Sequence, residues 1–195
     1  MPKYKIGVFG SAGSLGLDKN IKRFKKLAGM IGSGLAARNC ILITGASSGL
    51  PYFAALAASQ AGGVTWGFGA ALDRKILNET TLGCNNIVYS KLIYVPKNLN
   101  YITNIEIARK FRNVTSTAYC DAGIIISGMW GTMNEFTNLY DMGKVIGILS
   151  GTGGVADELP RLLRKIRKPS KAKVIFNKSP KKLVELVLKE LSKRK

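Results

Sequence analysis

The chain has 195 residues, 46% of them hydrophobic, which suits one globular domain with a sizeable core. It contains no histidine, which excludes Ser-His-Asp triads, histidine general bases and histidine metal ligands. No apolar run approaches the roughly 20 residues that span a bilayer, and the formal net charge of +19 favours anionic ligands and partners.

Short apolar runs alternate with amphipathic segments along the chain. The apolar runs are predicted strands, at residues 5–9, 41–44, 64–68, 87–95, 122–126, 145–149 and 173–176. The amphipathic segments are predicted helices, at residues 18–35, 51–61, 103–119, 132–142, 157–166 and 180–191. This alternation predicts an α/β fold, with a doubly wound parallel sheet, helices on both faces and a single domain over residues 1–195. Residues 171–195 add a basic strand and helix packed on that sheet.

Side-chain signals mark several helix starts. Asp18 and Ser179 are predicted N-caps, and Pro180 suits the first helical position after Ser179. The helical pattern that follows the 122–126 strand begins at Thr132.

The segment between the third strand and the 103–119 helix is harder to assign. Residues 87–95 are predicted as a fourth strand or as a hairpin-like pair around Ser90. Residues 79–86 and 96–101 are polar and turn-prone, so they are predicted loops.

Glycine-rich turns follow four predicted strands, after residues 9, 44, 127 and 149. The carboxyl ends of parallel strands lie at one edge of the sheet, where ligands bind, so we expect the turns to border one crevice. The third turn, with Gly128 and Gly131, joins a buried strand to a helix start. It therefore presents free N–H groups and the positive end of a helix to an anion, and we predict a phosphate or carboxylate there.

Two common nucleotide-binding motifs are incomplete. The first turn spaces Gly10, Gly13 and Gly16 as G-x-x-G-x-x-G, but the second strand ends at Thr44 without the acidic residue of a dinucleotide site. The Gly-Lys pair at residues 143–144 lacks the rest of a P-loop. The sequence therefore disfavours both NAD binding and a P-loop.

The stretch Gly128-x-x-Gly131-Thr132-x-x-Glu135 resembles the Pro-Gly-Gly-x-Gly-Thr-x-x-Glu signature of the Lonely Guy (LOG) family. Arg112-Asn113 stands where that family has Arg-Lys, and the first two glycine turns resemble the family's N-terminal turns. The resemblance covers roughly residues 4–165 and is closest to the molybdenum cofactor carrier branch, where Arg-Asn is usual. It implies a Rossmann-like fold and a nucleotide-like, phosphorylated ligand.

The resemblance also assigns roles. Arg112 and Glu135 are the candidate catalytic residues of a nucleoside 5′-monophosphate phosphoribohydrolase, in which a carboxylate stabilises the positive charge that develops as the N-glycosidic bond breaks. It implies no metal and no required cofactor. The residues that it places on the phosphate or nucleotide are Gly10, Ser11, Gly45, Ser47, Gly49, Asn113, Ser127, Gly128, Gly131 and Thr132.

Departures from the family pattern leave a second function open. Ser127 and Met129 replace Pro and the second Gly of the signature, Asn113 replaces Lys, and Arg109 stands where the hydrolases have Met. The alternative is a non-catalytic carrier of a molybdopterin-type cofactor, or a nucleotide sensor. The lysine decarboxylase activity once attributed to the family is not expected, because no lysine lies within the glycine turns.

The two candidate catalytic residues also have structural interpretations. Thr132-x-x-Glu135 has the form of a capping box, in which the Glu reaches back to the cap. Arg112 follows Arg109 and Lys110, as a solvated helix arginine would.

The positive charge is confined to the two ends of the chain. Residues 1–39 hold eight Lys and Arg against one acid and residues 161–195 hold fourteen against two, whereas residues 40–160 are balanced. Such a surface can bind nucleic acid, but aromatic residues for base stacking are not interleaved, so a solvated basic face is favoured.

The remaining expectations concern location and assembly. Cys40, Cys84 and Cys120 are far apart, which favours free thiols, a reducing compartment and hence the cytoplasm. A predicted strand begins within a few residues of the N-terminus, which leaves no room for a signal peptide. The resemblance implies a homodimer or homotetramer, and no membrane partner is expected.

Overall fold

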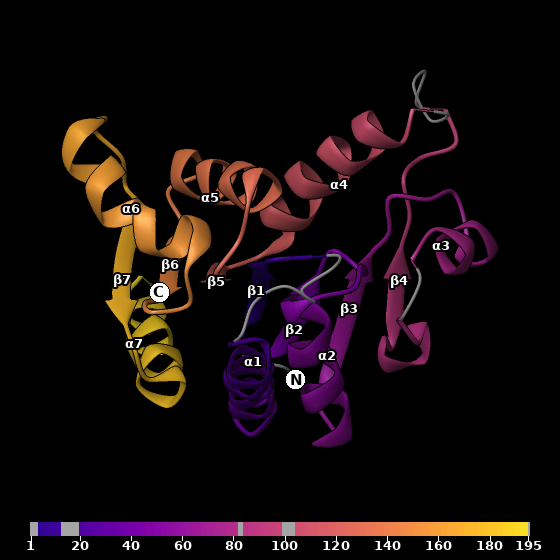
Figure 1. The fold of residues 1–195 in the computed structure, drawn as a ribbon, viewed down its shortest axis with the longest axis horizontal. Coiled ribbons are helices and arrows are strands. Elements are labelled where there is room, and N and C mark those ends of the chain that lie inside the picture. The colour runs from indigo at the N-terminus through magenta and orange to yellow at the C-terminus, as the bar shows by residue number, and fades with distance from the viewer. Residues whose placement is uncertain (1–3, 13–19, 82–83, 99–103, 195) are drawn as a thin grey trace.

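The computed structural model describes residues 4–12, 20–81, 84–98 and 104–194. In these residues seven strands form one sheet, all parallel, in the order β4-β3-β2-β1-β5-β6-β7 (Figure 1). The predicted α/β class and doubly wound sheet are therefore confirmed. The strands are β1 (Lys5–Gly10), β2 (Ile41–Thr44), β3 (Val64–Phe68), β4 (Lys91–Ile93), β5 (Ala122–Ile126), β6 (Val145–Leu149) and β7 (Lys173–Asn177).

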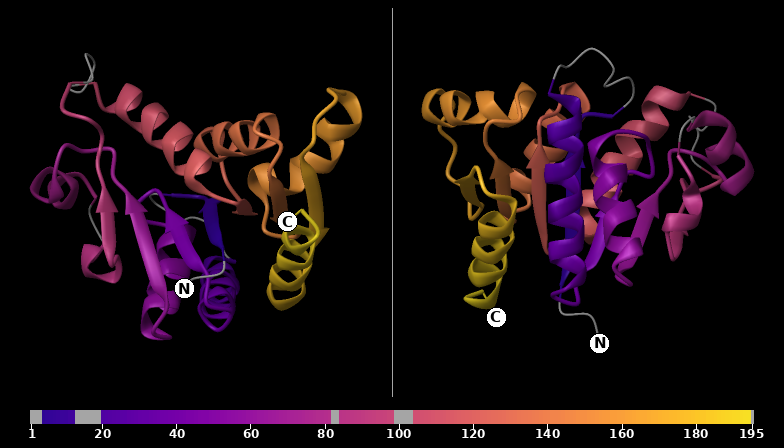
Figure 2. Two further views of the ribbon diagram at one scale, coloured as in Figure 1. Left: turned by 180° about the vertical axis from the view of Figure 1, so that it is seen from behind. Right: turned by 60° about the horizontal axis from the view of Figure 1, so that its bottom comes forward.

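Helices cover both faces of the sheet, as Figures 1 and 2 show. One face carries α4 (Ile105–Tyr119), α5 (Trp130–Asp141) and α6 (Gly154–Lys165). The other face carries α1 (Ile21–Ala36), α2 (Leu50–Gln60) and α7 (Pro180–Ser192). The short helix α3 (Arg74–Thr80) lies beside β4, at the edge of the sheet.

The central strands are apolar throughout because both of their faces are covered. β5 and β6 are buried along their entire length. Ile124 and Ile126 belong to the core shared with α1, α2 and α7, whereas Ile125 belongs to the core under α5, with Phe136 and Leu139. Burying such side chains stabilises the fold by about 1.5–3 kcal/mol each, so the two cores fix the sheet on which the loops rest.

The strand order reverses between β1 and β5. Gly10 pairs with Ile126 in the parallel register, so the two strands end side by side. The chain then leaves β1 towards α1 on one face of the sheet and leaves β5 towards α5 on the other. Loops that diverge in this way open a crevice at the carboxyl edge, which is where the sequence predicts the ligand.

Two helices begin earlier than the sequence predicts. α5 begins at Trp130 instead of Thr132, because Met129 adopts the extended conformation of an N-cap residue. α6 begins at Gly154 instead of Asp157, whose carboxylate accepts hydrogen bonds from the N–H groups of Gly151 and Gly153. In both cases the predicted start, Thr132 or Asp157, is a residue within the first turns of the helix. The N-cap itself is a residue of the preceding turn, Met129 or Gly153.

The start of α7 agrees with the sequence. Pro180 is the first residue of α7, and the Ser179 hydroxyl accepts the Lys182 N–H, as predicted. α4 begins at Ile105 after an Asn104 cap. The predicted cap at Asp18 and the predicted helix start at residue 103 lie outside the described residues.

The segment between β3 and β4 differs most from the prediction. α3 extends to Thr80 and a 3₁₀ turn, η1 (Asn86–Val88), follows, so the assignment of residues 79–86 to a loop was wrong at both ends. β4 pairs with β3 in parallel, Gly67 opposite Leu92, so residues 87–95 contain one short strand and no hairpin. Val88 and Tyr89 pack in the core although they lie outside β4. Their apolar side chains therefore give the sequence the same pattern as a buried strand.

Within the described ranges, no helix has both the length and the apolar character needed to cross a bilayer.

Candidate functional site

The loops after β1 and β5 are joined across the crevice. The Ser11 hydroxyl lies 3.0 Å from that of Ser127 and accepts the Gly128 N–H at 2.9 Å. The Ser127 N–H donates to the Thr152 hydroxyl at 2.8 Å. The donors of these predicted phosphate-binding residues are therefore used in hydrogen bonds within the protein, which hold the two loops together.

The fourth glycine turn, residues 151–154, does not border the crevice as expected. The Val155 N–H donates to the Gly128 carbonyl, and the Ala156 N–H donates to the Ser127 carbonyl. The turn therefore supports the β5–α5 loop through these two hydrogen bonds.

Two non-glycine residues in the loops at this edge have a left-handed backbone. Ser127 and Ala46 have positive φ angles of 55° and 44°, a conformation that non-glycine residues adopt only where the surroundings impose it.

The first turn of α5 offers backbone donors to the crevice. Within the described residues, no acceptor is found for the N–H groups of Trp130, Gly131 and Thr132, and the first helical hydrogen bond is donated by Met133 to the Met129 carbonyl. Gly131 has open space where a side chain would project. Unpaired N–H groups at a helix start, together with the helix dipole, form an anion site.

Arg112 on α4 faces this turn. Its guanidinium donates through Nη1 to the Gly45 carbonyl, and through Nε to the Asn113 Oδ1 at 3.0 Å. A Cβ atom at residue 45 would collide with that guanidinium, so glycine makes room for it. The Asn113 amide donates to Asn134 on α5 at 3.1 Å and contacts the Gly131 carbonyl at 3.5 Å. Arg112 is therefore a positioned side chain and not a solvated helix arginine.

Glu135 lies in the second turn of α5 and is 8% exposed. Its carboxyl has no hydrogen bond or ion pair with the described residues; burial raises its pKa to about 7, against the opposing charges of Arg112 and Lys110. Burial likewise lowers the pKa of Arg112, and Glu135 acts in the other direction. Because α5 is capped at Met129, Thr132-x-x-Glu135 is not a capping box.

These groups border an inner cavity of about 120 Å³. Most of the predicted site residues line it: Gly10, Gly45, Ser47, Arg112, Asn113, Gly131, Thr132 and Glu135. The others do not line it. Ser11, Ser127 and Gly128 take part in the hydrogen bonds between loops described above, and Gly49, with a φ of 108°, packs against the backbone of Ser11 and Ala12.

The sequence missed part of this wall. Phe9, Ala12, Pro51 and Met129 also line the inner cavity. Phe9 and Pro51 flank predicted glycine turns, a position that signals them, whereas Met129 stood out only as a departure from the LOG signature.

An outer cleft of about 860 Å³ adjoins the inner cavity and shares several of its lining residues. Its walls come from the Gly45–Ser48 loop, the end of α3 and the outer face of α4, which carries Arg109, Lys110 and Arg112. Trp130, at the start of α5, also lines the cleft and is 85% exposed. The inner cavity and the outer cleft are thus continuous along their shared lining residues.

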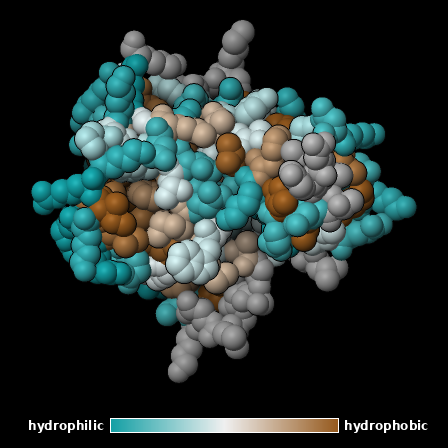
Figure 3. All heavy atoms as spheres, turned by 90° about the horizontal axis from the view of Figure 1, so that it is seen from above, coloured by the Kyte–Doolittle hydropathy of each residue, from teal (hydrophilic) through white to brown (hydrophobic). Residues whose placement is uncertain are grey.

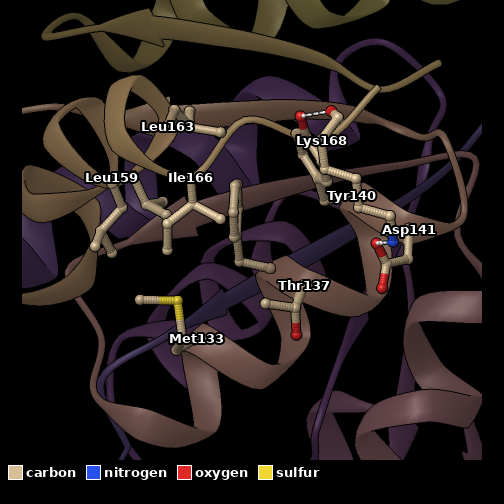
Figure 4. A pocket seen from close by; sticks show the side chains of 10 residues that line it. Met133, Thr137, Tyr140, Asp141, Leu159, Leu163, Ile166 and Lys168 are labelled. Carbon is tan, nitrogen blue, oxygen red and sulfur yellow. Dashed lines mark hydrogen bonds and ion pairs between the residues drawn. The ribbon is translucent and has the colours of Figure 1, made fainter. Parts of the chain in front are cut away.

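A different cavity, of about 250 Å³, lies between α5 and α6 (Figure 4). Met133, Leu159, Leu163 and Ile166 give it an apolar wall, and in Figure 3 a hydrophobic area is exposed towards the α6 end of the molecule. Its one cation, Lys168, pairs with Asp141 at 2.7 Å. This groove therefore differs from the crevice in having a largely apolar lining.

No cluster of three or more His, Cys, Asp or Glu side chains suitable for a metal ion occurs in the described part of the chain. The crevice brings together backbone amides, a guanidinium and one buried carboxyl.

Comparisons with known proteins agree with this architecture. A model of the SLOG cluster4 family matches residues 3–184, whereas no curated protein matches the sequence. The X-ray structure of TM1055 has a TM-score of 0.78 and 17% identity, covering 96% of this chain and 99% of its own. The Chlamydomonas reinhardtii molybdenum cofactor carrier protein has a TM-score of 0.65 and 18% identity, covering 98% of this chain and 99% of its own.

A third similar structure is that of DNA processing protein A from Helicobacter pylori, which binds single-stranded DNA. Its TM-score is 0.64 and its identity 17%, with 96% of this chain and 81% of the other covered. At these identities the solved structures establish the shared fold.

Proposed function

The chain belongs to the SLOG cluster4 family, and we propose that it binds a small phosphorylated ligand, with one phosphate on the first turn of α5. The observation that carries this proposal is the convergence of the unpaired N–H groups of residues 130–132 with the Arg112 guanidinium. The ligand is a nucleotide or a molybdopterin-type cofactor, the classes that the LOG-like resemblance and the similarity to a cofactor carrier support.

Arg112 is prepared for such a ligand by its neighbours. The Gly45 carbonyl and Asn113 occupy two of its donor groups and hold the guanidinium plane, which leaves further N–H groups for phosphate oxygens. An anion would also offset the hydration that Arg112 loses on burial. Hydrogen bonds between charged groups in such a setting are about twice as strong as neutral ones.

A molybdopterin-type cofactor fits the same arrangement. Its terminal phosphate would take the first turn of α5 and Arg112, and its ring system requires the volume of the outer cleft. When bound, the cofactor supplies redox chemistry at its metal. In this case the role of the chain would be to hold and shield the cofactor.

The proposal is tested by calorimetric titration with AMP and GMP and with the free nucleosides. Wild type should prefer the monophosphates, and Arg112→Ala should lower their affinity tenfold or more, because a charged hydrogen bond contributes about 1.5–3 kcal/mol. Arg161→Ala on α6, which lies outside the cleft, is the control. If nucleosides bind as well as their monophosphates, the phosphate does not lie on α5.

Glu135 favours a second candidate function, N-glycosidic hydrolysis of a nucleotide. Its carboxyl lines the inner cavity without a partner among the described residues, so in its ionised form it is available to stabilise positive charge at an anomeric carbon. Chromatography of base released from common monophosphates tests this: Glu135→Gln should keep binding and abolish release, because catalysis depends on interactions specific to the transition state. Wild type that binds a monophosphate tightly and releases no base would support the carrier and exclude hydrolysis of that nucleotide.

A further inference from the structure

The cleft is much larger than one phosphate requires. The inner cavity of about 120 Å³ opens into the outer cleft of about 860 Å³ past Gly45, Arg112 and Gly131, which line both. A ligand anchored at the first turn of α5 therefore extends along the wall that α4 provides. The chemistry of that wall indicates which groups the extended part carries.

Three cations line the outer cleft on α4, against one acid. Arg109, Lys110 and Arg112 project from this helix, and Glu106 is the one acidic residue that the described part of the chain adds to the wall. Arg109 stands three residues before Arg112, and residues so spaced are neighbours on a helix surface. The two like charges repel each other, and the charge of Arg109 lowers the pKa of Arg112.

The outer cations are available to a ligand. Arg109 forms an ion pair with Glu106 at 2.8 Å, but the two side chains are 52% and 72% exposed, and such pairs contribute at most about 1 kcal/mol. Lys110 has no ion-pair partner within the described residues. A second anionic group can therefore replace Glu106 at Arg109 and engage Lys110 at little cost.

We propose that the ligand is a nucleoside diphosphate, or a larger molecule built on one. One phosphate occupies the first turn of α5 with Arg112, and the other lies one turn further out along α4, on Arg109 and Lys110. The rest of the ligand then occupies the wide part of the cleft, where Trp130 offers an exposed ring for stacking on a base. This inference rests on the proposed function, because it requires the first phosphate to be on α5.

The test compares the affinities of ADP and AMP by calorimetry in a metal-free buffer. Wild type should bind ADP at least tenfold more tightly than AMP, because the second phosphate gains charge-assisted hydrogen bonds. Arg109→Ala should lower ADP affinity about tenfold more than AMP affinity, which removes the preference. Arg112→Ala should weaken both nucleotides.

The chain offers a matched control. Arg161 on α6 pairs with Glu158 three residues earlier at 3.1 Å, with side chains 55% and 60% exposed, and lies outside the cleft. Arg161→Ala removes the same charge from the same kind of pair and should leave the ADP-to-AMP ratio unchanged.

The possible failures are distinguishable. Equal affinity of wild type for AMP and ADP, or an equal loss of both in Arg109→Ala, overturns the second phosphate position and leaves the first intact. Absence of binding of either nucleotide overturns both this inference and nucleotide binding. A ratio that falls as much in Arg161→Ala as in Arg109→Ala shows that net charge, not the cleft, sets the preference.

Discussion

Glu135 combines burial with the absence of a hydrogen-bond donor among the described residues, and that combination governs its ionisation. The carboxyl is 8% exposed, and its neighbouring charges, Arg112 and Lys110, lower its pKa by less than burial raises it. A carboxyl whose pKa is about 7 changes charge near neutral pH. A bound phosphate would add negative charge beside it and favour its protonated form.

Glu135 should make the stability of the protein depend on pH. In the unfolded chain this carboxyl ionises near its ordinary value of 4.5, against about 7 in the folded protein. The folded protein holds the proton more tightly, so the stabilising contribution is complete below about pH 4.5 and is lost as pH rises through 7. At about 1.4 kcal/mol per pKa unit, the loss is roughly 3 kcal/mol.

Glu135→Gln stays neutral and should avoid that loss. Its free energy of unfolding in urea should resemble that of wild type near pH 5 and exceed it at pH 8. Glu158→Gln, an exposed acid on α6, corrects for the change in net charge. A Glu135→Gln variant less stable than wild type at pH 8 would show that the fold favours the ionised carboxylate, contrary to the expected effect of burial.

Two glycines of the site should respond differently to an added methyl group. Gly131→Ala meets open space, so its free energy of unfolding should stay within about 1 kcal/mol of wild type, while AMP affinity falls because the methyl group enters the cavity. Gly45→Ala displaces the Arg112 guanidinium and should lower both stability and affinity. Thermal unfolding measures the effect of each variant on stability, and calorimetry measures its effect on AMP affinity. Full AMP affinity in Gly131→Ala would exclude this turn as the phosphate site.

At the scale of elements, the site depends on how α4 and α5 are joined. Asn113 is 4% exposed and connects them: its carbonyl oxygen accepts from Arg112 on α4, and its amide donates to Asn134 on α5. The helix that carries the guanidinium is thereby held against the helix that presents the free amides.

The contributions of this link can be separated with two variants. Asn134→Ala removes only the hydrogen bond between the helices and should lower the free energy of unfolding by about 1 kcal/mol, with AMP affinity within twofold of wild type. Asn113→Ala also leaves the Nε of Arg112 without its acceptor, so it should cost about 1–3 kcal/mol and lower AMP affinity severalfold. Urea unfolding and calorimetry provide the readouts, and equal affinities in the two variants would show that Asn113 does not position Arg112.

The predictability of the elements follows from their burial. A strand covered on both faces must be apolar throughout, so runs such as Ile124–Ile126 were evident in the sequence. α3 was missed because its seven residues include Arg74, Lys75 and Glu79 and lack a long apolar stripe, although the Asp73 cap, which accepts the Ile76 N–H, was a usable signal.

The site was only partly accessible to sequence reasoning for a related reason. The glycine turn at residues 128–131 marked the inner cavity, since its local pattern joins a buried strand to a helix start. The outer cleft is formed by α3 together with α4, elements distant in sequence, and no local pattern encodes that arrangement. The start of α5 two residues earlier than predicted also excludes the capping-box interpretation of Glu135, because Thr132 lies inside the helix and is not its N-cap.

At the scale of the whole molecule, charge and site are on different surfaces. α1 and α7 pack side by side on the face opposite α4 and α5 (Figure 2), and an ion pair between Arg38 and Glu185 joins them. Lys26, Lys181 and Lys189 are exposed on these two helices and form no ion pair within the described ranges. The basic surface and the cleft are therefore separate, and we expect polyanions on the former and the small phosphorylated ligand in the latter.

Neutralising that surface should weaken polyanion binding and spare the cleft. The variant Lys26→Gln, Lys181→Gln, Lys189→Gln should elute earlier from a heparin column and show a shallower dependence of duplex DNA affinity on salt, by about 0.9 for each phosphate that a lysine no longer neutralises. Shortening the chain at residue 179 would be a poorer test, because Leu183, Val184 and Val187 of α7 are fully buried. AMP affinity should stay within twofold of wild type, since the three lysines lie outside both cavities.

If AMP affinity falls together with heparin retention, the two ligands share one surface and the division into two surfaces is wrong. If heparin retention is unchanged, polyanions bind elsewhere on the protein. The basic residues between α6 and β7 are then the next to neutralise.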